Sequence, residues 1–136
     1  MTALTSFPTA VSVANLLCPA AGALTVDANG TGIDLQDYEG LGLVIANYSL
    51  GTDADELCTI TLEDSADNSS FAAITAAVGA TAFAAIVDDA AAADRCFGRV
   101  INVNQARRYL RAVVDVTGTT PAFTGTVTFV GIKKQR

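Results

Sequence analysis

Two clusters of oxygen-bearing side chains have a spacing that could hold a metal ion. Both lie in short polar stretches between apolar segments, and they comprise Asp53, Asp55 and Glu56 in the first cluster and Asp64, Asp67 and Asn68 in the second. Carboxylate and amide oxygens placed in this way are ligands that Ca²⁺ accepts. Neither cluster has the central glycine and closing glutamate of a calcium-binding loop. We therefore interpret both clusters as solvated hairpin loops and expect no metal site.

The composition excludes most catalytic arrangements. The chain contains no histidine among its 136 residues, so neither a Ser-His nor a Cys-His nucleophile pair can form. Asp88 and Asp89 are adjacent, and neighbouring residues of a strand point to opposite faces, so these two carboxylates cannot converge on one substrate. The sequence also has no GxGxxG, P-loop, GxSxG or HExxH motif. We therefore expect a protein that is not an enzyme, with no catalytic residue and no cofactor.

The remaining group of residues that could act in binding is basic. It contains one tyrosine among five arginines, namely Arg95, Arg99, Arg107, Arg108, Tyr109 and Arg111. Arginine and aromatic side chains stack on nucleic-acid bases, but a net charge of −6 opposes the neutralisation of phosphates on which such binding depends. The same residue types are enriched at protein–protein contacts, and a solvated strand face is a third interpretation. We favour a protein interface that comprises Arg107, Arg108, Tyr109, Arg111 and Pro8.

Charge is divided unevenly along the chain. Residues 1–94 contain 13 of the 14 acidic side chains and no lysine or arginine, whereas residues 95–136 contain all eight basic side chains and only Asp115. One interpretation is that acidic and basic strands pair within one fold and neutralise each other. The other is a bipolar surface suited to self-association or to docking on a protein lattice.

The three cysteines, Cys18, Cys58 and Cys96, are an odd number at wide spacings. They cannot form a complete disulfide framework, so we expect reduced thiols, as in a protein assembled in the cytoplasm. Cys58 shares one strand face with Ile60 and Leu62, which is typical of a small core residue. No stretch reaches about 18 uninterrupted apolar residues, so we expect no membrane span.

Turn residues and short apolar segments predict an all-β protein. We expect residues 1–9 to form an extended N-terminal arm and residues 10–136 to form a single-domain antiparallel β-sandwich, of the jelly-roll or Ig-like type. An alanine-rich stretch leaves room for a short helix near 89–95. The expected strands are 10–17, 22–26, 32–36, 41–48, 57–63, 70–75, 82–88, 97–104, 107–117 and 123–132.

Two of these strands carry further information. In 107–117, the apolar residues Leu110, Ala112, Val114 and Val116 alternate with others, so we place them in the core. Residues 41–48 do not alternate, which is typical of a strand covered on both faces. Because one small sandwich cannot easily supply both covers, we expect a second subunit there and a homotrimer.

In three short motifs the sequence resembles a group of small structural proteins of tailed bacteriophages. They are a "YEG" segment within Asp34–Gly40, an "E-D/S-S-x-D-x-S-x-F" hairpin within Thr59–Phe71, and an "RYxR" strand at Arg108–Arg111. The resemblance covers residues 34–131. It implies a β-sandwich and a virion component such as a capsid decoration, or cement, protein.

The resemblance leads to one expected function and one alternative. The expected function is a non-enzymatic decoration protein that binds the major capsid protein on the outer surface of the coat lattice and stabilises it. Such a protein is located on the virion after assembly in the host cytoplasm, with neither nucleic acid nor membrane as a partner. The alternative is a tail, neck or head-fibre subunit, including a module that binds the host surface.

Overall fold

The computed structural model describes residues 11–17, 24–49, 57–81, 86–87 and 95–134. The predicted arm at 1–9, with Pro8, lies outside these residues, as do Cys18, the Asp53–Glu56 cluster and the Asp88–Asp89 pair. The helix expected near 89–95 also falls outside them, apart from its last residue. Arg95 is the first residue of a strand and therefore not part of a helix.

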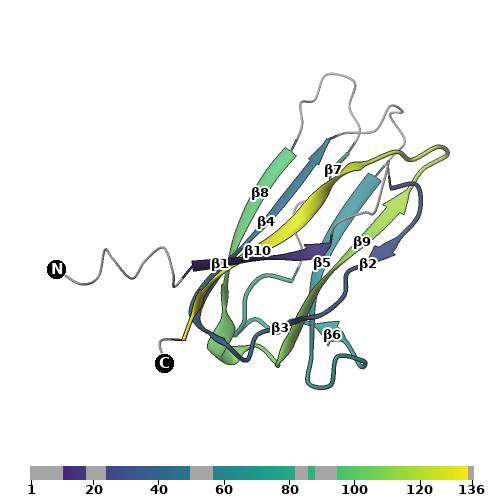
Figure 1. Ribbon diagram of the computed structural model, residues 1–136. Coiled ribbons are helices and arrows are strands. Elements are labelled where there is room, and N and C mark those ends of the chain that lie inside the picture. The colour runs from purple at the N-terminus through teal and green to yellow at the C-terminus, as the bar shows by residue number, and fades with distance from the viewer. Residues whose placement is uncertain (1–10, 18–23, 50–56, 82–85, 88–94, 135–136) are drawn as a thin grey trace.

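The described residues form two antiparallel sheets that pack face to face (Figure 1). We call the first one sheet I; its strand order is β1 (Val11–Leu17), β10 (Thr124–Lys133), β4 (Tyr38–Ser49) and β8 (Arg95–Asn102). We call the second one sheet II; at its centre β9 (Tyr109–Thr117) pairs with β5 (Leu57–Ser65). Its flanking strands are short: β2 (Ala28–Asn29), β3 (Ile33–Asp34), β6 (Ala72–Ala73) and β7 (Ile86–Val87).

The strand order is that of a jelly roll. β2 and β3 pair with successive parts of β9, and β6 and β7 both pair with β5, so each of these couples occupies one strand position. With the positions numbered along the chain, sheet I has the order 1-8-3-6 and sheet II the order 2-7-4-5. Two four-stranded sheets connected in this way form a jelly roll. The all-β sandwich is confirmed, and the jelly-roll alternative is the one adopted.

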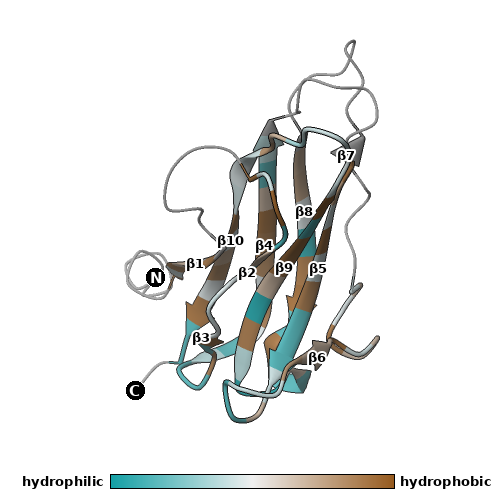
Figure 2. Ribbon diagram, turned by 90° about the vertical axis from the view of Figure 1, so that its right-hand side faces the viewer, coloured by the Kyte–Doolittle hydropathy of each residue, from teal (hydrophilic) through white to brown (hydrophobic). Residues whose placement is uncertain are grey.

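The core lies between the sheets. It consists of the side chains that point inward, which come from every second residue along each strand. From β9, Leu110, Ala112 and Val114 are fully buried and Val116 is nearly so, as predicted. Facing them from sheet I are buried side chains that include Val44, Ala46, Tyr48, Val127 and Phe129. Figure 2 shows apolar residues along both sheets, with hydrophilic residues gathered at the end of the sandwich where β3 and β6 lie.

Cys58 belongs to this core, as predicted. Its side chain is fully buried beside Ile60 and Leu62 of the same strand face. Burial, with a smaller contribution from Asp115, raises the pKa of the Cys58 thiol to about 12. Cys96 of β8, by contrast, is exposed.

The strand expected at 22–26 is wrong for the residues that the structure describes. Leu24 makes a single bridge to Phe123, and the next ladder is β2 at Ala28–Asn29. Between them the Asp27 carboxylate accepts a hydrogen bond from the Val116 backbone N–H at 2.8 Å. The Asp27 side chain, and not the backbone of a further strand, therefore binds this part of β9.

Two other boundaries differ for similar reasons. The strand expected at 97–104 ends at Asn102, whose side chain accepts from the Asn104 backbone N–H and caps the 3₁₀ helix η1 (Val103–Gln105). The strand expected at 107–117 begins at Tyr109, because the Arg107 backbone N–H donates to the Asp64 carboxylate instead of to a neighbouring strand.

Burial along β4 alternates, although its sequence does not. Val44, Ala46 and Tyr48 point into the core, while Leu41 and Leu43 are 62% and 38% exposed on the outer face of sheet I. The cover expected on the second face is therefore absent from the described part of the chain. Within those residues, Leu41 and Leu43 both remain partly exposed to solvent.

Candidate protein interface

The predicted interface residues lie at one end of sheet II, at and just before the start of β9. In the antiparallel register of β9 with β5, Arg111 lies opposite Glu63 and Tyr109 lies opposite Ser65. On the other side of β9, Tyr109 lies opposite Asp34 of β3. The register therefore sets basic residues of the second half of the chain beside acidic residues of the first half.

Arg107 binds Asp64 of β5 through several hydrogen bonds. Its Nε donates to Asp64 Oδ1 at 2.7 Å, its Nη2 donates to the Asp64 carbonyl at 2.7 Å, and its backbone N–H donates to Oδ2 at 3.0 Å. The Asp64 side chain is 5% exposed and that of Arg107 is 43% exposed. A buried carboxylate needs such partners because losing its hydration costs several kcal/mol, so this pair is structural.

Arg108 pairs with Asp34 at the surface. Its Nε and Nη2 donate to Asp34 Oδ2 at 3.1 and 2.7 Å, and the two side chains are 49% and 42% exposed. The guanidinium lies 5.1 Å from the centroid of the Tyr109 ring. The hydrogen bonds from Arg108, and then that from the Gln36 backbone N–H, lower the pKa of Asp34 from its ordinary value.

Arg111 is held between an acid and an aromatic ring. Its Nη2 is 2.7 Å from Glu63 Oε2, and its guanidinium carbon is 4.1 Å from the centroid of the Phe71 ring. Both members of the ion pair are about one quarter exposed. Arg111 is therefore less accessible to a partner than Arg107 and Arg108.

The loop that brings Phe71 to Arg111 is shaped by Asp67. The Asp67 Oδ1 accepts hydrogen bonds from the Ser65 hydroxyl and from the backbone N–H groups of Ser69 and Ser70, at 2.8 to 2.9 Å. The bond from Ser70 comes first among the causes that hold the pKa of Asp67 well below its usual range. Asn68 adopts a left-handed conformation with φ 59°. The second acidic cluster is thus a closed turn, as the hairpin-loop interpretation predicts.

These contacts support the interpretation in which acidic and basic strands pair within one fold. Arg107, Arg108 and Arg111 each bind a carboxylate of the same chain. The arginines do not form one cluster, because Arg95 and Arg99 belong to β8 of sheet I. The assignment of Arg107, Arg108, Tyr109 and Arg111 to an interface stays a prediction, and Pro8 lies outside the described residues.

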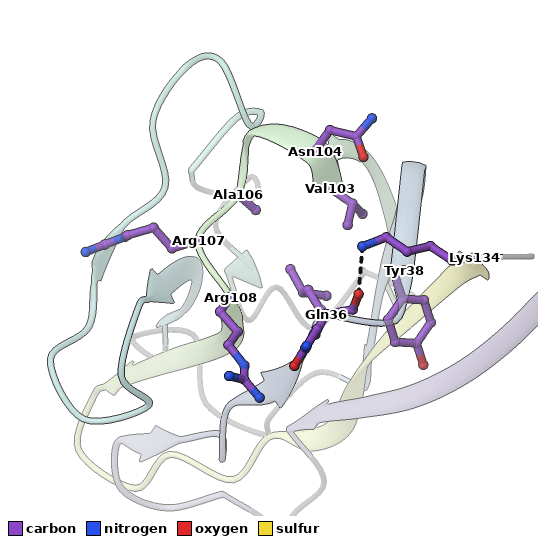
Figure 3. A pocket seen from close by; sticks show the side chains of 9 residues that line it. Gln36, Tyr38, Val103, Asn104, Ala106, Arg107, Arg108 and Lys134 are labelled. Carbon is purple, nitrogen blue, oxygen red and sulfur yellow. Dashed lines mark hydrogen bonds between the residues drawn. The ribbon is translucent and has the colours of Figure 1, made fainter. Parts of the chain in front are cut away.

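A hollow of about 480 Å³ lies beside this group (Figure 3). Leu35, Val103 and Ala106 supply apolar surface, and the polar lining includes Gln36, Asn104, Arg107, Arg108 and Lys134. Lys134 Nζ donates to the Gln36 carbonyl at 2.8 Å, whereas the Arg107 guanidinium points away from the hollow. Sequence reasoning missed Gln36, Asn104 and Lys134, because only the fold brings them to the arginines.

The described residues contain no group of three acidic, histidine or cysteine side chains that could bind a metal ion. In the second acidic cluster, Asp64 is bound to Arg107 while Asp67 is bound within its own turn, so the two carboxylates serve separate structural roles. Within the same residues, no helix is long and apolar enough to cross a membrane.

Comparison with known proteins shows likeness in fold only. No family model and no curated protein matches the chain. Among solved structures, it is similar to the SPBc2 prophage-derived protein YomS, with 12% identity, TM-score 0.50, and coverage of 90% of this chain and 93% of that one. A protein of Bacillus endospore appendages has 12% identity, TM-score 0.44 and coverage of 93% and 90%. A protein of infectious bursal disease virus strain Gt has 10% identity, TM-score 0.48 and coverage of 90% and 33%.

Proposed function

We propose that this protein is a non-enzymatic virion component that decorates the capsid of a tailed bacteriophage and stabilises the coat. The observation that carries the proposal is the rigid corner formed by Arg107, Arg108 and Tyr109. Internal ion pairs hold both guanidinium groups in place, yet each arginine side chain remains nearly half exposed. A partner can bind these groups without having to order them first.

The sequence motifs and the fold support a phage origin. The "E-D/S-S-x-D-x-S-x-F" hairpin forms the Asp67 turn that places Phe71 on Arg111. The "RYxR" strand begins β9, where Arg108 binds Asp34. These motifs build the corner, and a similar fold occurs in a prophage-derived protein. Jelly rolls are also a frequent architecture of viral capsid domains.

The corner is suited to a surface that offers carboxylates and carbonyl oxygens. Arg107 and Arg108 supply N–H donors, the Tyr109 ring supplies apolar area, and the neighbouring hollow of about 480 Å³ has room for a side chain. Arginine and tyrosine are enriched among residues that contribute most to binding. A protein that binds only the assembled coat stabilises that coat by mass action.

Location in the particle is the first test. Purified virions of the phage that encodes this sequence are separated into heads and tails, and each fraction is analysed by mass spectrometry. The chain should be found with the heads and the major capsid protein. Its recovery in the tail fraction supports instead a tail or neck subunit, and its absence from virions contradicts the proposal.

Binding through the corner is the second test. Exchanging the charges of one pair, Asp34→Arg together with Arg108→Asp, keeps an internal ion pair but reverses the charge that each position presents to a partner. The exchanged protein should fold normally and bind capsids that lack it more weakly than wild type in a co-sedimentation assay. Equal binding by the two proteins contradicts the role of Arg108.

We extend the proposal to a homotrimer on the particle, because the outer face of β4 has no cover within the described chain. A crosslinker with one amine-reactive end and one photoreactive end is applied to intact virions, because the sequence contains only two lysines and a reagent that joins amines to carboxylates would need both groups at the contact. Crosslinked dimers and trimers of this chain should appear beside chain–coat products. Chain–coat products alone contradict the trimer.

A further inference from the structure

An uninterrupted apolar row crosses the whole outer face of sheet I. In the strand registers, Val13 of β1 lies opposite Val130 of β10, Val130 lies opposite Leu43 of β4, and Leu43 lies opposite Val100 of β8. Side chains at directly opposed positions of neighbouring strands are in contact. The four residues therefore form one aliphatic ridge that reaches from one edge strand to the other.

The ridge and its flank contain five of the six large apolar side chains that are exposed among the described residues. Val13, Leu43 and Val100 are 64%, 38% and 60% exposed, and Leu41 and Ile132 beside them are 62% and 43% exposed. Among the described residues, Val26 is the only other large apolar side chain exposed to this degree. A hollow of about 370 Å³ lies among these side chains, where the β10–β4 register shifts between Val130 and Ile132.

This face is also free of charge over three neighbouring rows. Beyond the ridge, the next row contains Thr128, Ile45 and Gly98, and the following row contains Thr126, Asn47 and Cys96. The outer face of sheet II differs, because Glu63, Arg111 and Asp115 lie on it. Two copies of a chain with net charge −6 repel each other over most of their surface. Within these three rows two copies can approach without opposing like charges, whereas on the other side of the ridge Glu39 lies opposite Ile132.

The size of the face indicates how strong such a contact is. Four strands about 4.8 Å apart and rows about 6.6 Å apart give a face of roughly 20 Å by 20 Å, or about 400 Å² for each copy. A stable interface of standard size buries about 800 Å² for each partner. The face therefore suits a weak contact that becomes populated when copies are concentrated. Its aliphatic surface can be covered by the same surface of a second copy, since β-sheets pack face to face.

We propose that a second copy of this chain packs on the outer face of sheet I, with the row Val13–Val130–Leu43–Val100 at the centre of the contact. The association does not require a capsid, so it is separate from the proposed decoration function. Because both copies use the same face, this contact closes as a two-fold dimer and is an alternative to the trimer as the cover of β4. It leaves the arginine corner, on the other sheet, free to bind a different partner.

Sedimentation velocity of the full chain, from about 5 µM to about 1 mM, tests this contact. The wild type should associate reversibly, with a weight-average mass that rises with concentration. Leu43→Asp should remain monomeric across the range, because it buries a charge at the centre of the contact. The matched control is Thr61→Asp, at a half-buried position of β5 on the outer face of sheet II, and it should associate like the wild type.

Circular dichroism shows whether Leu43→Asp still folds. If it does not, Val100→Lys repeats the test at a more exposed position and should likewise remain monomeric. A wild type that stays monomeric at 1 mM overturns the proposal, as does equal loss of association in Leu43→Asp and Thr61→Asp. Deletion of residues 2–9 supplies a last comparison. If the deletion abolishes association while Leu43→Asp does not, the N-terminal segment makes the contact and the proposed face is wrong.

Discussion

Asp64 and Arg107 lie 43 residues apart in the chain and are joined by three hydrogen bonds, two from the arginine side chain and one from its backbone. Asp64 is nearly the last residue of β5, and Arg107 precedes β9 by two residues. The pair thus connects the end of one central strand of sheet II to the approach to the other. Because the Asp64 carboxylate is buried, the hydrogen bonds from Arg107 replace the hydration that it has lost.

Replacing Arg107 with alanine should destabilise the fold by about 1–3 kcal/mol. Removing one member of a buried ion pair costs about 3–5 kcal/mol, and the partial exposure of Arg107 and its remaining backbone hydrogen bond reduce that figure. Urea denaturation measures the change. The half-exposed pair supplies the control, and Arg108→Ala should shift the midpoint less. Equal midpoints for Arg107→Ala and the wild type contradict a structural role for the pair.

The Asp67 turn should lose stability in acid. The folded-state pKa of Asp67 lies below its ordinary value of 3.8, so its ionised form favours folding. This contribution is complete above the unfolded pKa and is lost as the pH falls below 3.8 towards the lower folded pKa. We expect Asp67→Asn to be less stable than the wild type at neutral pH. The difference in urea midpoint should shrink on acidification, and a difference that is constant from pH 7 to pH 2 contradicts this account.

Arg111 and Phe71 should be energetically coupled. The guanidinium lies 4.1 Å from the ring centroid, and a partly shielded cation–π contact contributes about 0.5–1 kcal/mol or somewhat more. A double-mutant cycle with Arg111→Ala and Phe71→Leu measures this coupling in the free energy of unfolding. The pair Arg108 and Phe71 is the control cycle and should give no coupling. Coupling near zero for both pairs contradicts a role for the ring.

The two described thiols should react at very different rates. Cys96 is exposed, whereas Cys58 is buried and its pKa is raised to about 12, so Cys58 offers almost no thiolate at neutral pH. In a Cys18→Ser background at pH 8, a maleimide reagent should modify one thiol in the folded protein and two in 8 M urea, as mass spectrometry shows. Modification of Cys58 in native buffer at the rate of Cys96 contradicts its place in the core.

Strand periodicity is enough to predict the long strands and their buried faces. In β9, and in β5 as far as Leu62, every second side chain is apolar, and Ile60, Leu62, Leu110 and Val114 are all buried as that pattern requires. The two-residue ladders of β2, β3, β6 and β7 follow no such pattern. Their extent depends on side chains such as Asp27, which replaces strand pairing by binding the backbone of β9.

The partners of the arginines could not be predicted, because they depend on register. Whether Arg111 meets Glu63 or a residue two positions away is set by the pairing of β9 with β5, which sequence alone does not define. The uneven division of charge along the chain did indicate that acidic and basic strands pairing within one fold was one of two interpretations. Gly30 is a further position that only the fold explains, since any side chain there would collide with the Leu16 carbonyl.

The position of β10 has a consequence for biosynthesis. This strand, the last of the described strands, lies between β1 and β4 in sheet I, and β1 pairs with it across almost the whole length of β1 (Figure 1). While Thr124–Lys133 is still inside the ribosome, β1 lacks the strand with which it pairs in sheet I. Sheet I is therefore completed only after β10 has left the ribosome, and the ridge that spans its four strands forms no earlier. Copies of the chain cannot recognise one another through the complete face before that point.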